Sequence, residues 1–116
     1  MGFYVIKHTD GNIMPILDQL VETAPHALHS IDPMAGVDIA VVKRMVGDRV
    51  CLIGNVNCAT LDSGTADEIA ASTRYALQQG MPGGGYIFST SNCIYTGMPL
   101  ANYERMLDIW RGEGNY

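Results

Sequence analysis

Four short β-type runs alternate with helical patterns along the 116 residues, and this alternation constrains the fold more than any other feature. Between the runs, apolar residues recur at helical spacing. One helix start is marked by a T-x-x-E capping box formed by Thr65 and Glu68. Repeated βα units predict a parallel sheet with right-handed crossovers, and therefore an α/β domain. The β-type runs lie at residues 3–6, 27–31, 50–53 and 86–89.

Two architectures satisfy this order: a small doubly wound open sheet, or half of a (β/α)8 barrel. No G-x-G-x-x-G motif follows the first run, so a dinucleotide-binding sheet has no positive support. Half a barrel leaves two strand edges and one apolar face exposed. We therefore expect a half-barrel to be completed by dimerisation or by a missing N-terminal half. The chain enters a β-type run almost at once, and we expect it to be part of a longer protein.

Every β-type run ends at a cluster of polar side chains. Because the C-terminal ends of parallel strands share one rim, we expect these side chains to meet at a ligand site. Asn, Asp and Ser at such positions also form turns and helix caps without any further function. The clusters are His8 and Asp10; His29, Ser30 and Asp32; Asn55, Asn57 and Cys58; and Ser91, Asn92, Cys93 and Tyr95.

The His8-Thr9-Asp10 segment places two chemically useful side chains on the same side of an extended stretch. His8 oriented by Asp10 suits general acid–base chemistry. A metal such as zinc would also accept His and carboxylate ligands, with Cys58 or Cys93 as thiolates. Both interpretations stay open from the residues alone.

Composition excludes several classes of partner. The net charge of −5 and the lack of a basic patch argue against nucleic acid and anionic membranes. Three cysteines without a C-x-x-C motif fit reduced thiols, so we expect a cytoplasmic protein. The run Gly83-Gly84-Gly85 precedes its strand, and we expect it at the end of the sheet opposite the polar rim.

The motifs resemble the C-terminal half of the uroporphyrinogen decarboxylase superfamily, which includes corrinoid-dependent methyltransferases. The resemblance implies that residues 1–116 form a single C-terminal half-barrel, carrying strands five to eight of a (β/α)8 barrel. It rests on HTDGN at 8–12, LHSIDP at 28–33, LIGNVNCATL at 52–61 and GGGYIFSTSNCIYTGMPLANYERML at 83–107.

Three positions bear on the branch of that superfamily. In the decarboxylase, a G-H-G-type motif after the last strand holds the tetrapyrrole through its histidine, and Asn92 stands there in this chain. In zinc-dependent methyltransferase relatives, an H-x-C motif and a later cysteine bind the metal. Here His8 matches the histidine and Asp10 replaces the first cysteine. Cys93 lies one residue from the expected second cysteine.

These matches imply methyl transfer between a small methylated substrate and a corrinoid carried by a partner protein. Uroporphyrinogen III decarboxylation and a non-catalytic, self-assembling half-barrel are the alternatives. We expect His8 and Asp10 to be catalytic, and His8 with Cys93 to be the ligands if zinc binds. The expected substrate-binding residues are Asn12, His29, Asp32, Asn55, Asn57, Asn92 and Tyr95.

Overall fold

A four-stranded parallel sheet forms the centre of the structure, a computed structural model that describes residues 2–115. Its strands are β1 (Ile6–His8), β2 (Ala27–His29), β3 (Cys51–Val56) and β4 (Tyr86–Thr90). They lie in the order β1-β2-β3-β4, and each neighbouring pair is parallel. The predicted α/β class is therefore confirmed.

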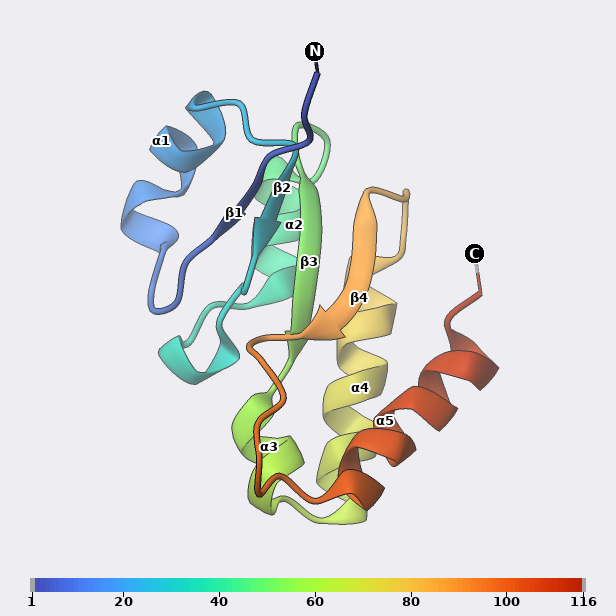
Figure 1. Cartoon of the computed structure of the whole chain (residues 1–116). Helices are drawn as coiled ribbons and strands as arrows, with labels where there is room; N and C mark the ends of the chain where they lie inside the picture. The colour runs from blue at the N-terminus through green and yellow to red at the C-terminus, as the bar shows by residue number, and fades with distance from the viewer. Residues whose placement is uncertain (1, 116) are drawn as a thin grey trace.

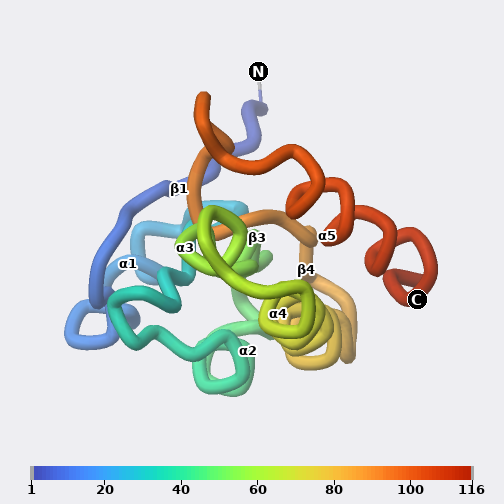
Figure 2. The backbone as a smooth tube through the Cα atoms, turned by 90° about the horizontal axis from the view of Figure 1, so that it is seen from below, coloured from blue at the N-terminus to red at the C-terminus, as the bar shows by residue number. Residues whose placement is uncertain are grey.

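The main helices gather on one side of this sheet. In Figure 1, α2 and α4 lie behind the strands, and the view from below in Figure 2 shows α1, α2, α4 and α5 as an arc around them. A doubly wound sheet has helices on both faces, so this arrangement excludes that alternative. Among residues 2–115, every helix is too short or too polar to cross a bilayer. The helical elements are η1 (Met14–Ile16), α1 (Leu17–Glu22), η2 (Pro33–Ala35), α2 (Ile39–Val46), α3 (Cys58–Ser63), α4 (Ala66–Gly80) and α5 (Leu100–Glu113).

The covered face of the sheet carries the main hydrophobic core. Leu28, Leu52 and Tyr86 are neighbours across three strands. All three belong to a buried cluster completed by side chains of α1 and α2. A second buried cluster joins Val56 to α3, α4 and α5.

The opposite face lacks such a cover among the described elements. Side chains alternate along a strand, so the next row, His8, His29, Ile53 and Ile87, points away from the helix-side core. Ile87 is 52% exposed, and Ile6, two residues before His8, is 57% exposed. Large apolar side chains on a strand normally lie in a core, so this face has the character of an unfilled interior.

Local boundaries differ from the predictions in several places: β2 ends at His29 and not at residue 31, and β3 extends to Val56 and therefore includes Asn55. The first strand begins at Ile6 and not at residue 3, although the Val5 carbonyl already accepts hydrogen bonds from His26 N and Ala27 N. His8 is consequently the last residue of β1 and not part of the following loop. Directly after β3, the short helix α3 begins at Cys58, and Asn57 caps it.

The capping box that begins α4 is confirmed. Thr65 Oγ1 accepts a hydrogen bond from Glu68 N at 3.3 Å, and Glu68 Oε2 accepts one from Thr65 N at 2.7 Å. The hydrogen bonds from the backbone and hydroxyl of Thr65 hold the pKa of Glu68 below its ordinary value. The ionised carboxylate therefore favours the folded helix.

Replacing Thr65 should weaken folding in a pH-dependent way. Thr65→Ala removes the cap, and loss of an N-cap costs about 1 kcal/mol at neutral pH. Because the folded pKa of Glu68 is lowered, its share of this stability is present above the ordinary glutamate pKa. That share is lost as pH falls through the lowered value. Urea denaturation at pH 7 and in acid should give a smaller difference between wild type and variant in acid.

Thr65→Ser is the matched control, because serine keeps the hydroxyl and also caps helices well. It should stay close to wild type at both pH values. Alanine keeps the backbone N–H that bonds Glu68, so the variant tests the bond from the Thr65 hydroxyl to the carboxylate. An equal loss of stability for Thr65→Ala at both pH values would contradict a contribution from that hydroxyl bond.

Candidate functional site

The C-terminal ends of the four strands bring several of the predicted residues to one rim. His8 ends β1, His29 ends β2, and Asn92 follows the end of β4. The segment after β4, drawn in orange, passes across the side of the sheet that the main helices leave open (Figures 1 and 2). Side chains from strands far apart in sequence are therefore close enough to bond.

Two histidines form the centre of this rim. His8 and His29 are direct neighbours in the parallel pairing of β1 with β2. Their Nδ1 atoms are 2.7 Å apart, and their ring centroids are 4.8 Å apart. His29 Nε2 lies 3.1 Å from the carbonyl oxygen of Thr90 in β4. The pair thus reaches across β3, which lies between β2 and β4.

Asp10 extends the network at the other side of His8. Its Oδ1 lies 3.5 Å from His8 Nε2 and accepts a hydrogen bond from Asn92 Nδ2 at 3.1 Å. Asn92 Oδ1 in turn accepts from Cys93 N at 2.7 Å. The predicted proximity of His8 and Asp10 is present, and Asn92 contacts the carboxylate directly.

Four of the predicted substrate-binding residues use their side chains within the fold. Asn12 Oδ1 accepts from Met14 N in the turn before η1, and Asn57 Oδ1 accepts from Ala59 N as the N-cap of α3. Asp32 Oδ2 accepts from Gly11 N at 3.0 Å, which fixes the loop that carries Asp10. The buried Asn55 donates from Nδ2 to the Ile31 carbonyl at 2.9 Å. Ligand contacts by these four side chains stay predictions.

Tyr95 lies next to α3, where its hydroxyl bonds to the carboxylate of Asp62. This hydrogen bond is the main cause that raises the pKa of Tyr95 above its ordinary value. Desolvation and the negative charge of Asp62 act in the same direction.

The donor arrangement does not assemble a full zinc site. Among residues 2–115, His, Cys, Asp and Glu side chains form no group of three or more that could hold a metal. A structural zinc site needs four ligands and a catalytic one needs three. Zinc binding by His8 and Cys93 stays a prediction, and proton transfer by His8 does not require a metal ion.

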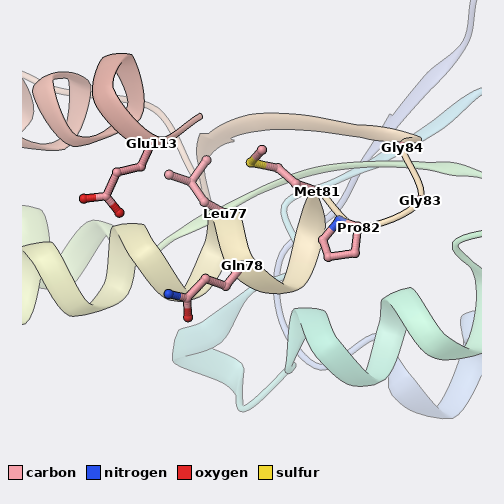
Figure 3. Close-up of a pocket in the computed structure, with 7 residues that line it drawn as sticks. All are labelled: Leu77, Gln78, Met81, Pro82, Gly83, Gly84 and Glu113. Carbon is pink, nitrogen blue, oxygen red and sulfur yellow. The ribbon is translucent and has the colours of Figure 1, made fainter. Parts of the chain in front are cut away.

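A cavity of about 460 Å³ lies elsewhere, beside the end of α4. Leu77 and Met81 line it, together with Gly83, Gly84 and Glu113 of α5 (Figure 3). The glycines precede β4, so this cavity lies at the end of the strand opposite the rim, as predicted for the glycine run. It holds none of the predicted catalytic residues.

Parallel strands with helices on one face and a polar rim define an α/β domain with a candidate site at the C-terminal ends of its strands. The family model of uroporphyrinogen decarboxylase (URO-D) matches residues 2–112. The chain belongs to this family, which confirms the resemblance seen in the motifs.

The chain is similar to two proteins of known name. A uroporphyrinogen decarboxylase from Thioalkalivibrio sulfidiphilus is 32% identical over 72 residues, which is 62% of this chain and 20% of the relative. The solved structure of a methyltransferase from Methanosarcina mazei matches with a TM-score of 0.78 and 26% identity. That match covers 95% of this chain and 31% of the other. The chain therefore spans about a fifth to a third of the length of these relatives.

The contact between Tyr95 and Asp62 can be tested by titration. Asp62→Asn removes the carboxylate charge, so the pKa of Tyr95 should fall toward that of a free tyrosine. Tyr75 is a matched reference, because its hydroxyl bonds Asp38 Oδ1 at 2.7 Å and its pKa is also raised. Tyrosine ring-carbon NMR resolves the two titrations.

Asp38→Asn should lower the pKa of Tyr75 and leave Tyr95 unchanged. Asparagine keeps the helix cap that Asp38 provides at α2, so the fold should persist. If Asp62→Asn left Tyr95 unmoved, the hydroxyl–carboxylate contact would be refuted.

Proposed function

We propose that this chain is the C-terminal half of a (β/α)8 barrel that transfers methyl groups between a small methylated substrate and a corrinoid carrier. The observation that carries the proposal is the match to the methyltransferase from Methanosarcina mazei over 95% of this chain. Asn92, at the position where the decarboxylase branch has a histidine, favours the same branch. The corrinoid belongs to a partner protein and enters as a co-substrate.

The architecture supports a half-barrel. Consecutive strands are neighbours, all parallel, with the main helices on one side, as in a stretch of a closed barrel. Thr90, at the end of β4, contacts His29 of β2 across β3, and Asn92, just after β4, bonds Asp10, just after β1, which supports a sheet that curls toward its uncovered face. That face then becomes the barrel interior when the remaining strands are supplied. The partner is a second copy or the complementary N-terminal half.

The network around His8 suits the proton requirement of methyl transfer. When the bond between the methyl carbon and its heteroatom breaks, the bonding electron pair stays on the heteroatom. The corrinoid accepts the methyl group, and the heteroatom needs a proton in order to leave as a neutral group. We assign that proton to His8 Nε2, with Asp10 stabilising the charged imidazole. In the return direction His8 takes the proton back.

Uroporphyrinogen III decarboxylation is the second candidate. It is favoured by the 32% identity to a protein of that name over 62% of this chain. In this case the side chains and backbone amides of the rim bind the carboxylates of the tetrapyrrole. Purified barrel incubated with uroporphyrinogen would then release carbon dioxide and give a less carboxylated porphyrinogen. After chemical oxidation of the sample to porphyrins, chromatography with fluorescence detection separates the products.

Removing His8 should impair methyl transfer. In the assembled barrel, His8→Ala should lower the rate about 10²- to 10⁴-fold, which is the usual contribution of a general acid. The assay follows corrinoid methylation by absorbance. His26→Ala is the control, because His26 precedes β2 at the other end of the strands, where its Nδ1 accepts from Val5 N. Equal rates for His8→Ala and wild type would remove the role given to His8.

Assembly is tested by mass. Light scattering of the chain alone should give more than one chain if it pairs with itself. If the complementary half is required, a complex should form only after the N-terminal half of a relative is added. Ile87→Lys places a charge on the uncovered face and should abolish either complex. Met45→Lys is the control, since Met45 is 43% exposed on α2 and lies on the helix side.

A chain that stays monomeric in both experiments would argue against the half-barrel. A complex that forms but transfers no methyl group and decarboxylates no porphyrinogen would favour the third interpretation, a half-barrel without catalysis.

A further inference from the structure

His29 was expected to bind substrate, but both of its ring nitrogens have partners inside the protein. Its Nε2 lies 3.1 Å from the Thr90 carbonyl oxygen, and its Nδ1 lies 2.7 Å from His8 Nδ1. It is only partly exposed, at the end of β2. A side chain held at both ends in this way is suited to orient a neighbour and not to capture a ligand.

The hydrogen bonds among Thr90, His29 and His8 determine which ring nitrogen of each histidine carries a hydrogen. A carbonyl oxygen only accepts, so His29 Nε2 must carry a hydrogen to bond Thr90. In a neutral imidazole, the other nitrogen is then a bare acceptor. His29 Nδ1 therefore accepts, and the hydrogen between the two rings is donated by His8 Nδ1.

This order leaves one ring nitrogen of His8 for chemistry. With Nδ1 engaged by His29, only Nε2 faces the carboxylate of Asp10, at 3.5 Å. When Nε2 gives up a hydrogen, His8 remains in the neutral form whose Nδ1–H is already bonded to His29. The donation therefore requires no rotation of either ring.

We infer that His29 is a positioning residue: anchored on the Thr90 carbonyl, it holds His8 with a hydrogen on Nδ1 and with Nε2 directed to Asp10. The consequence for catalysis rests on the proposed role of His8 as proton donor. The orientation itself depends only on the contacts among His8, His29 and Thr90. In Ser-His-Asp enzymes, a residue that fixes the histidine tautomer has the same kind of role.

The first test reads the tautomers directly. The full 116-residue chain, labelled with ¹⁵N-histidine, is studied by two-bond ¹H–¹⁵N correlation NMR, which distinguishes protonated from bare ring nitrogens. His29 should show hydrogen on Nε2, and neutral His8 should show hydrogen on Nδ1. His26 is an internal reference, because Val5 N donates to its Nδ1 and so requires hydrogen on Nε2. Hydrogen on Nδ1 of neutral His29, or on Nε2 of neutral His8, would overturn the inference.

Two substitutions test the contacts of the two His29 ring nitrogens one at a time. Glutamine places an amide near the position of Nε2, so His29→Gln keeps a bond to Thr90 and loses the one to His8. Asparagine places an amide near the position of Nδ1, so His29→Asn keeps a partner for His8. The His8 ring signals should move away from the Nδ1–H pattern in His29→Gln and change less in His29→Asn. His26→Gln should leave them unchanged, and the same pattern in all three variants would refute the positioning role.

Enzyme kinetics provide a second, independent test of the positioning role of His29. In the assembled barrel, His29→Gln should lower kcat by at least about tenfold, within the roughly 10⁴-fold that loss of tautomer control costs in Ser-His-Asp enzymes. KM should change little, because His29 does not contact substrate. A rise in KM with unchanged kcat would mean that His29 binds substrate after all. If methyl transfer is absent altogether, the NMR result still decides the orientation of His8.

Discussion

The structure depends on the burial of only one face of its parallel sheet. Leu28, Leu52 and Tyr86 pack against helices and supply the apolar burial that stabilises the domain. The alternate row leaves Ile87 half exposed and places His8 and His29 on the face without a helical cover. Stability and chemistry are therefore assigned to opposite faces of the same strands. This separation explains why polar, mutually bonded side chains are tolerated in a sheet of this size.

Much of the fold follows from local sequence signals. The helical spacing, the Thr65–Glu68 box and the apolar runs each act over a few residues, so they identify elements without knowledge of their neighbours. The start of β1 at Ile6 was harder to predict from the sequence, because a strand begins where its backbone pairs with the neighbouring strand, here β2. Helix α3 escaped prediction because its six residues carry little apolar periodicity, and its signal was the Asn57 cap.

The candidate site was predicted in outline only. Shared strand ends correctly brought His8, Asp10 and Asn92 together, since parallel topology alone determines that rim. The actual bonds join residues up to 82 positions apart, and no local pattern encodes them. The carbonyl of Thr90 is a backbone group, so its role as the anchor of His29 leaves no trace in residue identity. Asn12 and Asn57 illustrate the converse, because asparagine at such positions also forms turns and helix caps, and their side chains bond backbone N–H groups here.

The contact of His29 with Thr90 joins β2 to β4, and the bond of Asp10 with Asn92 joins the segments that follow β1 and β4, so both tie together parts of the sheet that are not adjacent. Their lengths consequently vary with the curvature of the sheet. A flatter sheet would move Thr90 away from His29 and Asn92 away from Asp10, and both would loosen the hold on His8. Whatever completes the fold therefore acts on the site mechanically, through the curvature it imposes, even where it contributes no side chain to the chemistry.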